Sequence, residues 1–222
     1  MDYSDSIKVV LVGTTHPGNI GTTARAIKTM GLSKLDLVCP KEFPSNEATY
    51  RSKAAKDILE KASIHETLFE SVKGCEMVIG TSARNRKVPW PVLNPKNASK
   101  QINKAVKNNS KVAIVFGRED RGLTNEELGL CNLHIHIPTN EDYTSLNLAQ
   151  AVQIVTYEIR MNFLELESLK SDQEWDVELA SAEQTERLIE HMDELMKEVE
   201  FYDTDNPRKL LMRVRRFFKR SG

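Results

Sequence analysis

The chain has 222 residues, of which 40% are hydrophobic and 28% charged, which gives room for one good core and an appendage. No apolar run approaches the ~18 residues that span a bilayer, and acidic residues precede the first apolar run. The composition therefore excludes a membrane protein and predicts a cytoplasmic one without a signal peptide.

Strand-like and helix-like segments alternate over most of the chain. Apolar, β-branched runs predict strands covered on both faces at 7–13, 35–40, 76–82, 111–117 and 132–138. Amphipathic patterns predict helices at 19–30, 49–62, 97–109 and 124–131, and a long helix, capped by Ser145 or Asn147, that ends near residue 169. This alternation predicts an α/β fold with a mostly parallel sheet and helices on both faces.

The last quarter of the chain has a different character. A polar, acidic stretch predicts a linker at 166–180, between a sheet domain at 1–165 and a helical hairpin at 181–222. Ser181 and Gln184 are spaced as a capping box, and Asn206-Pro207 is typical of a helix start.

Charge is unevenly distributed in that region. Residues 171–206 hold thirteen acidic side chains and two basic ones, whereas residues 207–222 hold seven basic side chains and no acid. A net charge of −1 is therefore no argument against a nucleic-acid partner, because the local field steers a polyanion.

Several common sites are disfavoured. Gly13 and Gly18 have the spacing of a phosphate-binding loop, but Asn19-Ile20 follows where Lys and Ser/Thr are needed. No GxGxxG follows the first predicted strand, and no acidic residue ends the second, which disfavours dinucleotide-binding enzymes and the open-sheet methyltransferases. His134 and His136 lack further ligands at metal spacing, so we predict no metal.

The three cysteines, Cys39, Cys75 and Cys131, are odd in number and show no CxxC spacing. They lie in or near apolar runs, and we expect reduced thiols in the core of a cytosolic protein.

Three motifs begin at the ends of predicted strands: NxGxxAR at Asn19, FGxExxGL at Phe116 and IPxxxxxxSLNLAxAV at Ile137. Their order resembles the SPOUT class of RNA 2′-O-ribose methyltransferases, and most closely the TrmJ type, which methylates nucleotide 32 in the tRNA anticodon loop. The resemblance covers essentially the whole chain, since further similar segments lie at 30–32, 80–84, 89–91, 123–128 and 206–218.

The resemblance implies a trefoil knot, in which the final strand, loop and helix pass through an earlier loop. It also implies a homodimer in which the partner subunit completes each site. S-adenosylmethionine would be the cofactor and tRNA the partner. The cofactor-binding positions that correspond in this sequence are Thr81, Ser82, Ala83, Gly117, Ile137, Thr144, Ser145, Leu146 and Asn147.

The same resemblance implies that Arg25 is catalytic and lies at the target 2′-hydroxyl or its phosphate. A guanidinium stays protonated in proteins, so a role as the base is doubtful. We favour a role in orienting the phosphate and stabilising the alkoxide, together with Ser145. The structural alternative is an ordinary ion pair between Arg25 and a neighbouring acid.

The resemblance implies supporting roles for three more polar residues. Glu119 would organise the site, by pairing with Arg25 across the dimer or by holding backbone amides. Asn19 would fix its loop or contact RNA, and Asn147 would brace the knot and the methionine end of the cofactor. Simpler roles remain open, as helix caps for the two asparagines and as a solvated turn acid for Glu119.

Candidate contacts to RNA phosphates are the basic side chains near the motifs and in the tail: Arg84, Arg86, Arg118, Arg213, Arg215, Arg216 and Lys219. Ordinary surface charge, and for the tail a packing hairpin with a solvated basic face, are the alternatives.

Two other functions fit the same fold. One is a catalytically silent RNA-binding protein, which the intact Arg25, Glu119, Ser145 and Asn147 disfavour. The other is a ribose methyltransferase acting on ribosomal RNA, which the TrmJ-like tail and Pro89-Trp90-Pro91 disfavour.

Overall fold

The computed structural model describes residues 3–82, 91–168, 182–202, 210, 211, 213 and 214. The chain divides into two compact units, Met1–Lys170 and Ser171–Gly222. The proposed linker at 166–180 and the predicted cap at Ser181 fall almost entirely outside the described residues. No helix in the described ranges is long and apolar enough to cross a membrane.

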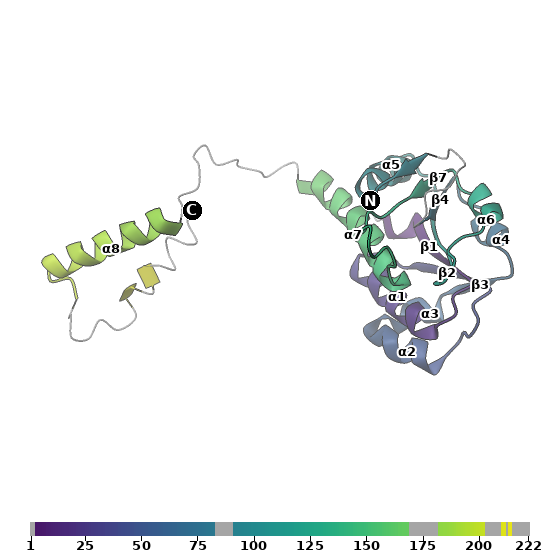
Figure 1. Ribbon diagram of the computed structural model, residues 1–222, viewed down its shortest axis with the longest axis horizontal. Helices are drawn as coiled ribbons and strands as arrows, with labels where there is room; N and C mark the ends of the chain where they lie inside the picture. Colours follow the sequence, from purple (N-terminus) through teal and green to yellow (C-terminus); the bar gives the residue numbers. More distant parts are fainter. Residues whose placement is uncertain (1–2, 83–90, 169–181, 203–209, 212, 215–222) are drawn as a thin grey trace. The chain divides into compact units, whose positions relative to one another are not determined.

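The first unit is built on a parallel sheet with the strand order β3-β2-β1-β6-β4-β7-β5 (Figure 1). Its strands are β1 (Ile7–Val12), β2 (Lys34–Val38), β3 (Ser63–His65), β4 (Met77–Thr81), β5 (Val92–Leu93), β6 (Val112–Phe116) and β7 (Leu133–Ile135). Its helices are α1 (Pro17–Thr29), α2 (Asn46–Ser52), α3 (Lys56–Glu60), α4 (Leu68–Val72), α5 (Pro95–Lys107), α6 (Asn125–Gly129) and α7 (Leu148–Ser168).

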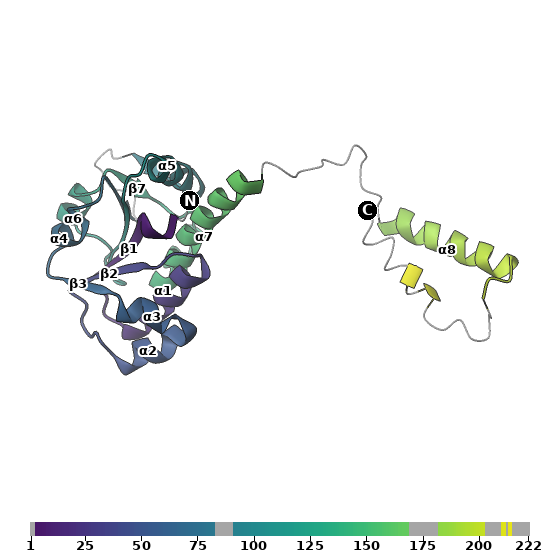
Figure 2. The same ribbon diagram turned by 180° about the vertical axis from the view of Figure 1, so that it is seen from behind.

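Both faces of the sheet are buried, because its strands alternate between two hydrophobic cores. Val9 and Leu11 of β1 join a core formed with helices α1, α5 and α7. Val10 and Val12 join a second core formed with the short helices α4 and α6. The two groups of helices lie on opposite sides of the sheet in both views (Figures 1 and 2).

The strand order reverses its direction at the centre of the sheet. On one side of β1 the sheet continues in chain order, with β2 next to β1 and β3 next to β2. On the other side of β1 lies β6, which comes much later in the chain. Ligands of open α/β sheets bind outside the carboxyl ends of the strands at such a reversal. Leu11 pairs with Phe116, so the loops that follow β1 and β6 leave the sheet side by side.

The structure confirms the α/β class and the five predicted strands, which are shorter by one to four residues than the patterns suggested. β3 and β5 were not predicted, since three and two residues are too few to show a period. The helix predicted at 49–62 is wrong: α2 ends at Ser52, and Lys53 has φ 52, which breaks the helix. Cys39 is exposed rather than in the core, although all three cysteines are free.

The second unit contains α8 (Ala182–Glu198), and the described residues Leu210, Leu211, Arg213 and Val214 are also helical. Ile189 of α8 is buried, whereas the side chain of Leu195 on the same apolar stripe is 55% exposed. Most of the second predicted helix lies outside the described residues.

The contact between α1 and α2 requires a glycine at position 21. A Cβ atom on Gly21 would lie 2.1 Å from the backbone oxygen of Ala48, which cannot move without shifting α2. We expect Gly21→Ala to lower the free energy of unfolding by roughly 1–3 kcal/mol, the usual cost of overpacking, as measured by urea denaturation.

Gly129→Ala is the matched control, because a Cβ atom on Gly129 meets no atom within 4 Å. This variant should be neutral or more stable by up to ~1 kcal/mol, since alanine favours helices. Equal unfolding midpoints for the two variants would contradict the close contact at Gly21.

Candidate active site

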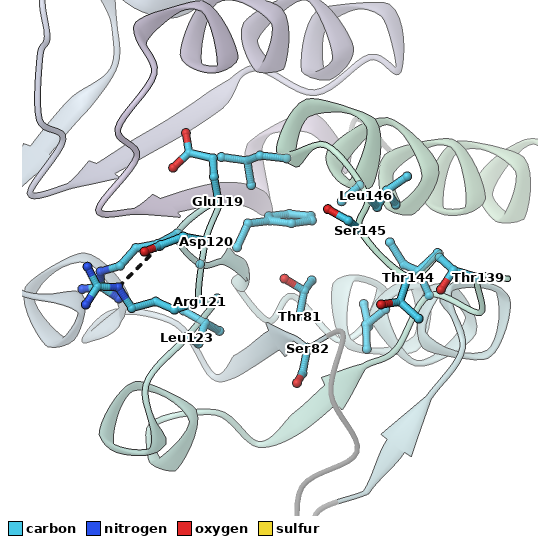
Figure 3. Close-up of a pocket in the computed structure, with 18 residues that line it drawn as sticks. Thr81, Ser82, Glu119, Asp120, Arg121, Leu123, Thr139, Thr144, Ser145 and Leu146 are labelled. Carbon is cyan, nitrogen blue, oxygen red and sulfur yellow. Dashed lines mark ion pairs between the residues drawn. The ribbon is translucent and has the colours of Figure 1, made fainter. Parts of the chain in front are cut away.

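A cavity of about 280 Å³ opens at the carboxyl edge of the sheet (Figure 3). Three segments far apart in the sequence line it: Thr81 and Ser82 after β4, residues 116–123 at the end of β6, and residues 135–151 around the β7–α7 connection. These segments include two of the three sequence motifs. Apolar side chains line the cavity together with backbone, hydroxyl and charged groups, a mixture typical of small-ligand sites.

The loop after β6 is folded tightly on itself. The amide of Arg118 donates to the oxygen of Gly122 (3.2 Å), and the amide of Gly122 donates back to the oxygen of Arg118 (2.9 Å). A Cβ atom on Gly117 would lie 2.1 Å from the carbonyl carbon of Gly122, so only glycine fits at that position. The cavity is therefore lined on this side by closely packed backbone.

The side chain of Arg118 is held by a carboxylate of its own chain. Its guanidinium makes two hydrogen bonds of 3.0 Å to Glu127, whose carboxylate also accepts from the amide of Thr124 at the start of α6. Burial raises the pKa of Glu127, but the bonds from Arg118 and Thr124 outweigh this and lower it. This ion pair fixes the guanidinium beside the cavity, which Arg118 also lines, and the phosphate contact predicted for Arg118 stays a prediction.

Glu119 accepts hydrogen bonds from the loop that follows β1. Its carboxylate receives the amide (3.0 Å) and hydroxyl (3.0 Å) of Thr15, the amide of His16 (3.2 Å) and the side-chain nitrogen of Asn19 (3.0 Å). Burial raises the pKa of Glu119, but these donors, with Asn19 the strongest, hold it below the ordinary value. In Figure 3 the carboxylate points out of the cavity, toward that loop.

Asn19 and Asn147 extend this contact to the third motif. The amide nitrogen of Asn147 donates to the side-chain oxygen of Asn19 (3.0 Å). The oxygen of Asn147 accepts from the backbone amides of Ala149 (2.9 Å) and Gln150 (3.3 Å), and so caps α7. The chain of bonds from Glu119 through Asn19 to Asn147 joins all three motifs. Asn147 is a helix cap, whereas Asn19 lies inside α1 and is not one, and the bracing role of Asn147 stays a prediction.

The predicted cofactor positions that the structure describes lie together. Thr81, Ser82, Gly117, Ile137, Thr144, Ser145 and Leu146 all line the cavity, whereas Asn147 lies next to it. Thr81 donates its hydroxyl to the oxygen of Val115 (3.1 Å), and the amide of Ser82 donates to Ile135 (2.9 Å). Ala83 is outside the described residues.

The structure describes only some of the basic residues that were predicted for catalysis and RNA contact. Arg25 is exposed on α1, does not line the cavity of its own chain, and makes no side-chain hydrogen bond or ion pair with any residue that the structure describes. Arg213 is exposed in the second unit. The remaining positions, Arg84, Arg86, Arg215, Arg216 and Lys219, lie outside the described residues.

Sequence reasoning missed Thr15 and His16 as functional positions. Both contribute a backbone amide, which carries no residue signature, and Thr15 also contributes its hydroxyl. The one signal in the sequence is that His16 is not a capping residue type. In the structure His16 stands at the start of α1, and its side chain makes no capping bond. Within the described ranges, no group of three His, Cys, Asp or Glu side chains is placed to hold a metal.

Comparison with known proteins identifies two family models along the chain. Residues 6–157 match the SpoU rRNA Methylase family, and residues 183–222 match the C-terminal domain of the tRNA methyltransferase TrmJ.

Individual relatives match over nearly the full chain. The tRNA (cytidine/uridine/adenosine-2′-O-)-methyltransferase TrmJ of Pseudomonas aeruginosa is 46% identical, over 98% of this chain and 88% of the relative. The tRNA (cytidine/uridine-2′-O-)-methyltransferase TrmJ of Yersinia pestis is 41% identical, over 97% and 84%. Among solved structures, a probable methylase family protein from Haemophilus influenzae Rd KW20 is 38% identical, with a TM-score of 0.70 over 97% of this chain and 88% of that one. The chain therefore belongs to the SpoU methylase family, in which it groups with the TrmJ methyltransferases.

Proposed function

We propose that the protein transfers the methyl group of S-adenosylmethionine to the ribose 2′-hydroxyl of nucleotide 32, a cytidine or uridine, in the tRNA anticodon loop. The observation that carries the proposal is the likeness of nearly the whole chain to relatives named as tRNA 2′-O-methyltransferases, together with the match of residues 183–222 to the C-terminal domain of a tRNA methyltransferase. The match of the second unit favours tRNA over ribosomal RNA as the substrate. The site of action would be the cytoplasm, where tRNA is found.

The cavity fits the cofactor by its chemistry. The hydroxyls of Thr81, Thr144 and Ser145 and the surrounding backbone suit a ribose and the amino acid end, while Ile137 and Leu146 suit the faces of an adenine. The side chains of Ser82 and Asn147 and the backbone at Gly117 would hold it further, together with Ala83. When bound, the cofactor supplies an activated methyl group, so the reaction requires no metal.

The residues of the chain supply position and charge. The bonds from Glu119 to the loop after β1 and from Asn19 to Asn147 fix the three motifs before substrate arrives, and correct placement of nucleophile and methyl group is the main requirement of this transfer. Arg25 orients the target phosphate and stabilises the developing alkoxide, with Ser145 beside it. The guanidinium remains protonated throughout, so Arg25 is not the proton acceptor.

The proposal includes a homodimer and a knot. Arg25 does not line the cavity of its own chain, which supports a site that the partner subunit's Arg25 completes. The segment between β7 and α7 passes through the loop after β6 in the proposed trefoil knot, and the two segments line the same cavity. In the second unit Arg213, Arg215, Arg216 and Lys219 contact tRNA phosphates.

The direct test is methyl transfer from labelled S-adenosylmethionine to unmodified tRNA transcripts, with the product mapped by mass spectrometry. We expect one 2′-O-methyl group at nucleotide 32, and no transfer to the same transcript carrying 2′-deoxyribose at that position. Methylation of the deoxy transcript, or transfer only to ribosomal RNA, would contradict the proposed target.

A substitution of Arg25 separates catalysis from cofactor binding. Arg25→Ala should lower the single-turnover rate of transfer by ~100-fold or more, because it removes a charge from the developing alkoxide. Cofactor affinity, measured by calorimetry, should change by no more than about threefold. Lys100→Ala, at an exposed cation on α5, is the control and should leave both unchanged. Loss of cofactor binding in Arg25→Ala would instead indicate a structural role.

The lowered pKa of Glu119 predicts how stability depends on pH. A carboxyl with a depressed pKa in the folded state stabilises the protein above its ordinary pKa, and this contribution is lost as the pH falls through the folded value. Glu119→Gln should therefore be less stable than the parent by up to ~1 kcal/mol at neutral pH, since it loses bonds to a charged acceptor that solvent already screens in part.

The difference should shrink when urea denaturation is repeated at about pH 4, near the ordinary range of a glutamate, and below it. Glu126→Gln, at an exposed acid in the first turn of α6, is the control. If the loss of stability in Glu119→Gln stays constant with pH, the charge of the Glu119 carboxylate does not stabilise the loop after β1.

A further inference from the structure

A second cavity, of about 640 Å³, lies at the opposite edge of the sheet from the candidate active site. The amino ends of β1, β2 and β6 contribute Ile7, Lys34 and Val112 to its lining, and the segments after α3 and α4 close it. Strands of a parallel sheet all begin at one edge, so the six residues of β1 separate the two cavities by about 20 Å.

The floor of this cavity is a fixed polar cluster centred on Asp36, which is buried. One oxygen of its carboxylate accepts from Lys8 (2.9 Å), Ser71 (2.8 Å) and the ring of His65 (3.1 Å). Lys8 also donates to the backbone oxygen of Ser71. Because the cluster neutralises its own carboxylate, Asp36 does not repel an anion from the space above it.

The rim of the cavity carries an excess of positive charge. Five lysines line the cavity against three carboxylates, in a chain whose net charge is −1. Lys8 and Lys34 have acidic partners, Asp36 at 2.9 Å and Asp5 at 3.7 Å. The other three, Lys61, Lys73 and Lys111, are exposed and make no ion pair with any described residue.

The third carboxylate is also occupied. Glu70 accepts from the backbone amides of Glu66 and Thr67 (both 3.2 Å), and so caps α4. All three acids that line the cavity are therefore engaged by the protein. Glu76, next to the cavity, accepts from the backbone amide of Lys111 (2.6 Å) and makes no ion pair with its side chain, so the three lysine side chains remain available to a ligand.

We propose that Lys61, Lys73 and Lys111 form a phosphate-binding site for the RNA backbone, separate from the site of methyl transfer. This inference rests on the proposed function only for the identity of the RNA. A polyanion that reaches the carboxyl edge of the sheet needs about 20 Å more, several nucleotides of chain, to reach this edge too. The site therefore engages backbone outside the anticodon loop, contributes affinity and orientation, and reads no base.

The test compares two triple variants of the full chain. In the first, Lys61→Gln, Lys73→Gln and Lys111→Gln remove the rim charges. In the second, Lys96→Gln, Lys100→Gln and Lys104→Gln remove three exposed lysines of α5 and change the net charge equally. Binding of full-length tRNA is measured over a range of salt concentrations, with cofactor binding and thermal unfolding as checks on folding.

We expect the rim variant to bind tRNA about tenfold or more weakly at ~0.1 M salt, with a salt slope lower by two to three units, since each phosphate contact contributes about 0.9. Its rate of transfer at saturating tRNA should equal that of the parent, because the lysines contribute affinity and lie far from the site of methyl transfer. An unchanged salt slope, or an equal loss in the α5 variant, would overturn the proposal.

Two further readouts separate the possible failures. Submillimolar binding of inorganic phosphate to the parent protein, with tRNA binding unaffected in the rim variant, would overturn the proposal in favour of a free phosphate ligand. If the parent methylates tRNA but the rim variant binds it normally, the second site fails and the proposed function stands. If the parent transfers no methyl group but the rim variant alone loses tRNA affinity, the second site stands without that function.

Discussion

The arrangement of the loops at the carboxyl edge of the sheet depends on one carboxylate, whose hydrogen-bond donors lie about a hundred residues away in the sequence. α1 begins without a side-chain cap of its own, and the amides that precede it would otherwise lack an acceptor. Glu119, about a hundred residues later, accepts from Thr15 and His16 and in turn holds Asn19. Asn19 in turn accepts a hydrogen bond from the side chain of Asn147. The positions of the three motif segments therefore depend on the ionised state of a single side chain.

The same sheet separates two kinds of recognition. At the carboxyl edge, the cavity is lined by backbone, hydroxyls, apolar side chains and charged residues of both signs from the loop after β6, which suit a compact neutral or zwitterionic group. At the amino edge, the cavity is lined by lysines over a neutralised carboxylate, which suit phosphate. Both properties follow from buried strands, since a sheet covered on both faces leaves only its ends for ligands.

The sequence was sufficient to predict the elements that have a clear hydrophobic or capping pattern. Five strands and the helix that begins near residue 124, where the structure has a capping box of Thr124 and Glu127, were predictable from short patterns. The break of the helix at Lys53 was not predictable, because no sequence pattern indicates a positive φ at a lysine. In the site, the motifs indicated which residues gather, but not that Arg118 is paired with Glu127 or that Glu119 accepts from Thr15 and His16, since those partners are fixed by tertiary contacts.

The close approach of Gly117 to Gly122 has a consequence for inhibitors of this protein. The floor they would meet there is main chain, and any side chain at position 117 would collide with the opposite arm of the loop at 2.1 Å. Drug resistance usually arises when a side chain in contact with the inhibitor is exchanged while the pocket survives. A compound anchored to the amides and carbonyls of this loop would leave few such exchanges open, because a substitution at Gly117 that displaced the compound would also dismantle the pocket.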